Sequence, residues 1–143
     1  MNVHFSVRLP TDVESVPLVR GLVRQALEHL GVVETGIQEI VLALTEACAN
    51  VVQHAGDHEE YQVDVAIDDT VCRISVIDDG AGFDPEAIAD EPARSPLDGG
   101  RGLLLMRALV DRLAFRETED GRHGVFLEKQ LATPSPRLRL LPT

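Results

Sequence analysis

The chain has 143 residues, of which 44% are hydrophobic and 26% charged, a composition typical of one soluble globular domain. Its formal net charge of −11, from 24 acidic and 13 basic side chains, argues against direct binding to nucleic acid or to an anionic membrane. No apolar run approaches the roughly 18 residues of a membrane span, and the first residues do not resemble a signal peptide, so we expect a cytoplasmic protein.

The first third of the chain predicts one strand and two helices. Residues 3–9 alternate between apolar and polar types, which predicts a strand. Residues 13–30 carry apolar side chains at helical spacing, with Thr11 or Asp12 as the expected N-cap. The same spacing predicts a second helix over residues 34–55.

The remainder predicts two hairpins separated by a third helix. Residues 61–67 and 71–77 both alternate, and the short polar turn between them predicts an antiparallel hairpin. After a polar segment, a helix is predicted over residues 103–110. Residues 113–117 and 125–131 predict a closing hairpin.

This order of elements predicts an α+β fold. We expect a two-layer α/β sandwich, with a mostly antiparallel sheet and the helices packed on one face. One domain is expected over residues 1–133, followed by a flexible, proline-containing tail over residues 134–143. Cys48 and Cys72 lie in apolar periodic segments and are expected to be reduced core residues.

A polar trio on the second predicted helix is the first candidate site. Glu46, Asn50 and His54 follow one another at intervals of four, so they share one side of the helix. They can be solvated polar residues of an amphipathic helix. They can equally supply a carboxylate that takes a proton and an amide oxygen that binds Mg²⁺, whose remaining ligands would be water and substrate phosphates.

The segment SVIDDGAGFDP is the second candidate. Asp78 follows a predicted strand, and Gly80 and Gly82 give the backbone freedom to approach a flat ligand closely. A carboxylate at such a strand end can accept a hydrogen bond from an exocyclic amine such as that of adenine. The plain alternative is an acidic turn.

The glycine-rich segment before the third helix is the last candidate. Gly100, Arg101 and Gly102 precede Leu103, and unpaired backbone N–H groups at a helix N-terminus form a ready anion site. The segment lacks the following Lys and Ser or Thr of a P-loop, and no strand precedes it as in a dinucleotide fingerprint. A helix start that needs a tight turn explains it equally well when it is taken alone.

The three motifs together resemble a known set of nucleotide-binding motifs. Their order is similar to that of the superfamily of DNA gyrase, Hsp90, histidine kinases and MutL (GHKL), with its Bergerat ATP-binding fold. The stretches LALTEACANVVQHA, VIDDGAGFDP and GGRGLLLMRALVD resemble in particular the anti-sigma-factor serine/threonine kinases.

The resemblance implies a role for each motif. Asp78 would bind the adenine amine of ATP, with Gly80 and Gly82 shaping the loop. Asn50 would coordinate Mg²⁺, Glu46 would be the catalytic base or orienting carboxylate, and residues 84–99 would form a lid. The third motif would hold phosphate oxygens through Gly100, Arg101, Gly102 and the amide of Leu103.

The resemblance also implies a function and partners. The chain would be an ATP-dependent protein serine/threonine kinase that phosphorylates an anti-anti-sigma (STAS-domain) protein, which competes with a sigma factor for the kinase. Relatives of this kind commonly form homodimers. A nucleotide-gated binding module with little phosphotransfer is the alternative, and a purely structural interaction domain would treat all three motifs as accidents. Glu46 favours the kinase, because binding alone needs no base.

Two positions depart from the pattern of the related kinases. Some of them place an arginine shortly before the third motif, where this chain has Asp98 and Gly99, and the nearby cations are Arg94, Arg101 and Arg107. Many also carry a hydroxyl residue before the metal-binding asparagine, where this chain has Ala49.

Overall fold

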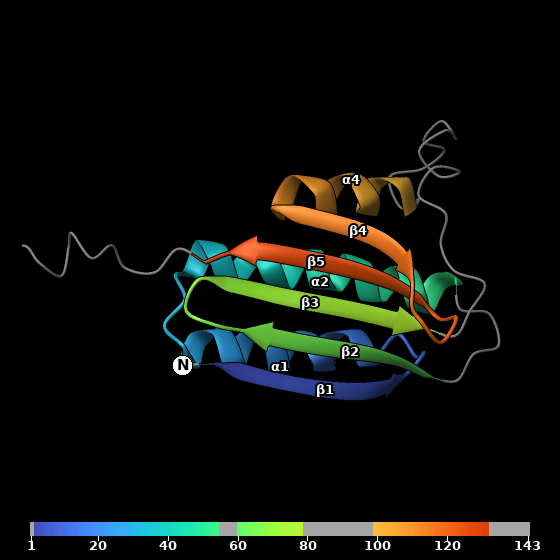
Figure 1. Cartoon of the computed structure of the whole chain (residues 1–143), viewed down its shortest axis with the longest axis horizontal. Helices are drawn as coiled ribbons and strands as arrows, with labels where there is room; N and C mark the ends of the chain where they lie inside the picture. Colours follow the sequence, from blue (N-terminus) through green and yellow to red (C-terminus); the bar gives the residue numbers. More distant parts are fainter. Residues whose placement is uncertain (1, 55–59, 79–98, 132–143) are drawn as a thin grey trace, which may run out of the picture.

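The structure, a computed structural model, describes residues 2–54, 60–78 and 99–131. Figure 1 shows a curved sheet with helices on one side of it. The elements are, in chain order, β1 (Val3–Pro10), α1 (Ser15–His29), α2 (Glu34–His54), β2 (Glu60–Ile67), β3 (Val71–Asp78), α4 (Gly99–Leu109), β4 (Arg112–Glu117) and β5 (His123–Gln130).

The strands form one antiparallel sheet in the order β1-β2-β3-β5-β4. Helices α1 and α2 lie behind the sheet in Figure 1, and α4 lies beside β4 and packs against α2. The predicted α+β fold and the predicted order of elements are therefore confirmed. None of the helices in the described ranges is long and apolar enough to cross a membrane.

The core lies between the sheet and the helices because each element is apolar on only one side. Alternate residues of β2, Val63, Val65 and Ile67, point to the helices and are buried, as the period of a strand requires. The matching stripe of α2 includes Ile37 and Leu44, which are equally buried. Cys48 and Cys72 are free thiols within this core, as expected.

Two predicted helix starts were wrong. The expected side-chain cap from Thr11 or Asp12 is absent: α1 begins at Ser15, and the Asp12 main-chain carbonyl accepts bonds from the Ser15 N–H and hydroxyl, at 3.0 and 2.7 Å. Helix α4 begins at Gly99 and not at Leu103. Glycine disfavours helix, but packing against α2 outweighs that propensity here.

Some predicted features lie outside the described residues. These are Gly80, Gly82, the lid before Gly99, Arg94, and the tail over residues 134–143.

We predict that unfolding becomes easier in alkali because of the two thiols. Burial raises the pKa of Cys48 and of Cys72 from 9.0 to about 12. Their contribution to stability is therefore complete below about pH 9 and is lost as the pH rises towards about 12, at on the order of 1 kcal/mol per thiol at pH 10. Urea unfolding at pH 8 and pH 10 measures this loss.

The double variant Cys48→Ala, Cys72→Ala is the control. It should show a smaller fall in unfolding free energy between the two pH values than the wild type. An identical fall in both proteins would contradict the prediction.

Candidate functional site

Three elements end or begin at the same end of the molecule. The C-terminal half of α2, the C-terminal end of β3 and the N-terminus of α4 all lie at the right-hand end in Figure 1. Each carries one of the motifs found in the sequence. The fold therefore brings together residues that lie more than fifty positions apart along the chain.

The backbone of α4 touches α2 directly at Gly102. A Cβ atom at this position would lie 2.7 Å from Glu46 Oε2 and 3.8 Å from Asn50 Oδ1. Only glycine leaves the Glu46 carboxylate where it is, because real Cβ atoms do not approach other atoms so closely. The first and third motifs are thus in contact.

Asn50 is a buried amide with an unsatisfied group. Its side chain is only 5% exposed, and its Nδ2 has no hydrogen-bond partner among the described residues. A buried polar group without a partner costs about 1–3 kcal/mol, so such groups are rare without a functional reason. The interpretation of this helix side as merely solvated is wrong for Asn50, although His54 is exposed and Glu46 is half-buried.

Asp78 ends β3 on the side of the sheet that faces the helices. Alternation places it on the same side as Ile74 and Val76, which belong to the core. Its cross-strand neighbours are Tyr61 of β2 and His123 of β5. Cross-strand partners share a face, so these two residues flank Asp78, which is half-buried.

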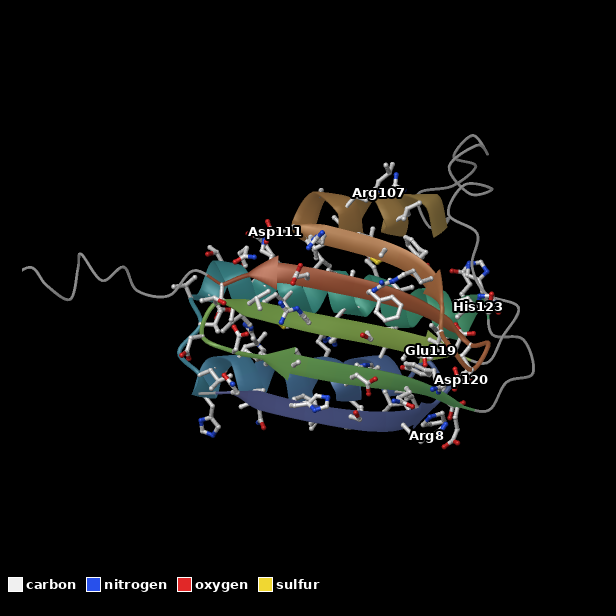
Figure 2. All side chains as sticks on the ribbon, viewed as in Figure 1. Arg8, Arg107, Asp111, Glu119, Asp120 and His123 are labelled. Atoms are coloured by element: carbon white, nitrogen blue, oxygen red, sulfur yellow. The ribbon has the colours of Figure 1, made fainter. Side chains whose placement is uncertain are left out.

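Sequence reasoning missed Tyr61 and His123. Neither belongs to a motif, and only the register of the strands, which is not visible in the sequence, places them beside Asp78. Figure 2 shows His123 at the same end of the sheet as Glu119 and Asp120 of the β4–β5 turn.

Tyr61 also connects the site to the start of α1. Ser15 Oγ donates to the Asp12 carbonyl, so the Tyr61 hydroxyl, 2.7 Å away, donates to Ser15. Burial raises the pKa of Tyr61 well above its ordinary value, and the neighbouring Cys48 adds to the rise. The phenol therefore remains a neutral donor that ties β2, α1 and α2 together beside Asp78.

The N-terminus of α4 can bind an anion through its backbone. Its first four N–H groups have no acceptor within the helix, and Gly100, Arg101 and Gly102 belong to this turn. The side chain of Leu103 is buried and anchors the turn in the core. Arg107 is exposed and extends away from the sheet in Figure 2, so it does not point to the shared end of α2 and β3.

A metal at this site would need oxygen atoms from its ligand. No group of three or more His, Cys, Asp or Glu side chains within residues 2–54, 60–78 and 99–131 could hold a metal ion. Asn50 offers one amide oxygen, which suffices for a cation whose other ligands are water and phosphate. A carboxylate, an amide and an anion site in contact suit chemistry on a phosphorylated ligand.

The chain is similar to known proteins. Residues 9–127 match the family model of the histidine kinase-like ATPase domain. The chain is 30% identical over 130 residues to the serine-protein kinase RsbW of Halalkalibacterium halodurans, covering 82% of this chain and 80% of the relative. It is 27% identical over 125 residues to RsbW of Bacillus velezensis, with 77% and 76% covered.

Two solved structures have the same fold. The RsbU and RsbW domains of Rv1364c from Mycobacterium tuberculosis match with a TM-score of 0.69 and 22% identity, over 93% of this chain and 34% of that chain. This chain thus spans about a third of the solved chain with the RsbU and RsbW domains. The SiaB–SiaC complex from Pseudomonas aeruginosa matches with a TM-score of 0.57 and 14% identity, over 88% and 89%.

We predict that Gly102→Ala weakens ATP binding at least tenfold. The added methyl group displaces the Glu46 carboxylate and occupies space between the first turn of α4 and Asn50 Oδ1. The matched control is Gly21→Ala in α1, where a Cβ meets no atom within 4 Å. The control should bind ATP normally and gain up to about 1 kcal/mol in unfolding free energy, as alanine favours helix. Equal affinities of both variants in calorimetry would contradict the prediction.

Proposed function

The chain belongs to the histidine kinase-like ATPase family, and from this premise we propose that it is an anti-sigma-type regulator that acts as a protein kinase. It uses ATP to phosphorylate a serine or threonine of an anti-anti-sigma (STAS-domain) partner. The unmodified partner competes with a sigma factor for the kinase, and phosphorylation ends that competition. The observation that carries the proposal is the buried Asn50 side chain, whose Nδ2 has no partner among the described residues, next to the backbone of Gly102.

The residues present fit ATP and Mg²⁺. Asp78 would accept a hydrogen bond from the adenine amine, and Asn50 Oδ1 would hold Mg²⁺. The Asn50 side chain is buried and its Nδ2 has no partner among the described residues, as expected of a residue reserved for a ligand. Bound Mg²⁺ supplies neutralisation of the charge that develops on the phosphates.

Glu46 orients the acceptor hydroxyl and accepts its proton. Its carboxylate lies next to the first turn of α4, where Gly100, Gly102 and the Leu103 amide face the phosphates. General base catalysis contributes typically 10²–10⁴-fold to a rate. Because Gly102 has no Cβ, the half-buried Glu46 carboxylate has room beside α4.

The N-terminus of α4 binds the phosphates without a cluster of positive side chains. Its N–H groups and its helix dipole favour an anion at this end. In a chain of net charge −11 this matters, because unscreened carboxylates repel a polyphosphate.

A second candidate is a nucleotide-gated binding module with little phosphotransfer. Asp98 and Gly99 stand where some related kinases have an arginine, and Arg107 extends away from the sheet. Loss of a cation from the transferred phosphate would lower the rate of transfer without preventing ATP binding. The two candidates differ in the need for Glu46.

We predict that the wild type binds ATP in preference to GTP and only with Mg²⁺, and that Asp78→Asn weakens ATP binding at least tenfold. The variant replaces an acceptor by an amide that can present a donor, which costs about 1–3 kcal/mol when the pair is buried. Calorimetry with Mg²⁺ and then with EDTA measures this. The control Asp64→Asn changes a carboxylate that accepts a bond from Gln62 on the other sheet face and should bind normally.

No binding by the wild type at millimolar ATP would refute the nucleotide site. Normal binding by Asp78→Asn would show that the adenine site lies elsewhere.

We predict that Glu46→Gln keeps ATP affinity within threefold and loses at least 100-fold in transfer of phosphate to an anti-anti-sigma partner. The amide preserves the shape of the side chain but cannot accept a proton. Glu34→Gln, at the exposed start of the same helix, is the control and should transfer normally. If Glu46→Gln retained full transfer, Glu46 would not be the base. If the wild type bound ATP but transferred none, the binding module would be the better description.

A further inference from the structure

We propose that Lys129 is a positioning residue that holds α4 in place against α2 and so aligns the phosphate-binding turn with Asn50. This inference rests on the proposed function, because it assigns Lys129 a part in the same nucleotide site from the opposite end of α4. Lys129 lies on β5 and belongs to none of the sequence motifs.

The Lys129 ammonium joins three elements at one point. Its Nζ donates to Glu39 Oε2 of α2 at 2.5 Å and to the Leu109 carbonyl, the last residue of α4, at 2.7 Å. The Lys129 side chain is 18% exposed and that of Glu39 is 40% exposed, so the pair is only partly screened by water. A cation at the C-terminus of α4 also complements the helix dipole.

The main chain of β5 ties the same end of α4. Following α4, the Asp111 N–H donates to the Glu128 carbonyl at 2.9 Å, and Asp111 Oδ2 accepts from the Gln130 N–H at 2.6 Å. Residues 128–130 of β5 therefore hold the C-terminal end of α4 to the sheet. Of these contacts, only the one through Lys129 extends to α2, the helix that carries Glu46 and Asn50.

The spacing along the two helices relates the Lys129 contact to the contact between Glu46 and Gly102. Helices α2 and α4 run in opposite directions in Figure 1. Glu46 meets Gly102 at one end of the pair, and Glu39 meets Leu109 through Lys129 at the other. Both separations are seven residues, which is two helical turns or about 10 Å. The four residues thus lie on the facing sides of the helices at matching heights.

Two attachment points on matching faces determine how far α4 can slide along α2. Without Lys129, the Leu109 carbonyl and the Glu39 carboxylate lose their shared donor, and the C-terminal end of α4 keeps only its bonds to β5 and its apolar packing on α2. Loss of Lys129 should therefore reduce ATP affinity more than it reduces stability.

The test compares Lys129→Met with a matched control on the other face of the sheet. In nucleotide-free protein, Lys129→Met should shift the backbone amide resonances of Gly102 and Leu103, which lie seven and six residues from Leu109, the α4 residue that Lys129 contacts. With ATP and Mg²⁺ it should raise KM for ATP five- to twentyfold and change kcat at saturating ATP less than twofold. Lys129→Arg, which can still donate to both oxygens, should restore both properties.

Arg73→Gln is the matched control. On the face of the sheet that points away from the helices, Arg73 Nε donates at 2.8 Å to Oε1 of Glu128, the residue before Lys129. It should leave the Gly102 and Leu103 resonances and KM for ATP unchanged. Equal effects of Lys129→Met and Arg73→Gln, or no effect of Lys129→Met on Gly102, would overturn the proposal.

The resonance measurement without nucleotide and the kinetic measurement with ATP distinguish a failure of this inference from a failure of the proposed function. If the wild type fails to bind ATP, the proposed function fails, while the nucleotide-free resonances still report whether Lys129 sets the position of Gly102. If the wild type binds ATP and Lys129→Met binds it equally well with unshifted resonances, the function stands and the positioning role is refuted.

Discussion

The contact between the backbone of α4 and one face of α2 is the constraint on which the site depends. At Gly102 the two helices approach so closely that a single methyl group would meet the Glu46 carboxylate. This approach places a helix terminus that can bind an anion next to the buried amide and the carboxylate of α2, which lie more than fifty positions away along the chain. The sheet supports this contact because α2 packs on it in the core, and β5 binds the C-terminal end of α4.

The contact also explains how an acidic chain can hold a polyphosphate. Several arginines in the described ranges are engaged elsewhere: Arg73 and Arg112 by Glu128 on the open sheet face, and Arg24 by Glu28 and Glu34 at the helix surface. The helix terminus offers N–H groups that add no net charge to the fold, and Asn50 offers a neutral oxygen. Such a site binds an anion without the repulsion among like charges that a cluster of arginines would create when the ligand is absent.

The sequence predicted the elements well because their information is local. Period-two alternation marked the strands around Val63 and Ile74, and helical spacing marked α2. The helix starts at Ser15 and Gly99 were missed because tertiary packing and a main-chain acceptor, not local propensity, decide them. The motifs identified Glu46, Asn50 and Asp78, but the burial of Asn50 and the neighbours of Asp78 depend on helix packing and strand register, which no local pattern contains.

The position of Lys129 is a further feature that local sequence patterns did not predict. A lysine in an alternating strand is typical of a solvent-facing position, yet alternation with Val125 and Leu127 places this one on the core side. Its long side chain can lie there because the ammonium reaches two oxygens at the edge of the helix layer. An apolar residue would fill the space but leave the Leu109 carbonyl and Glu39 without their shared donor. A charged side chain on the core side of a strand thus indicates that polar groups of the neighbouring helix need a partner. Here that helix is α4, whose N-terminus is the proposed phosphate site.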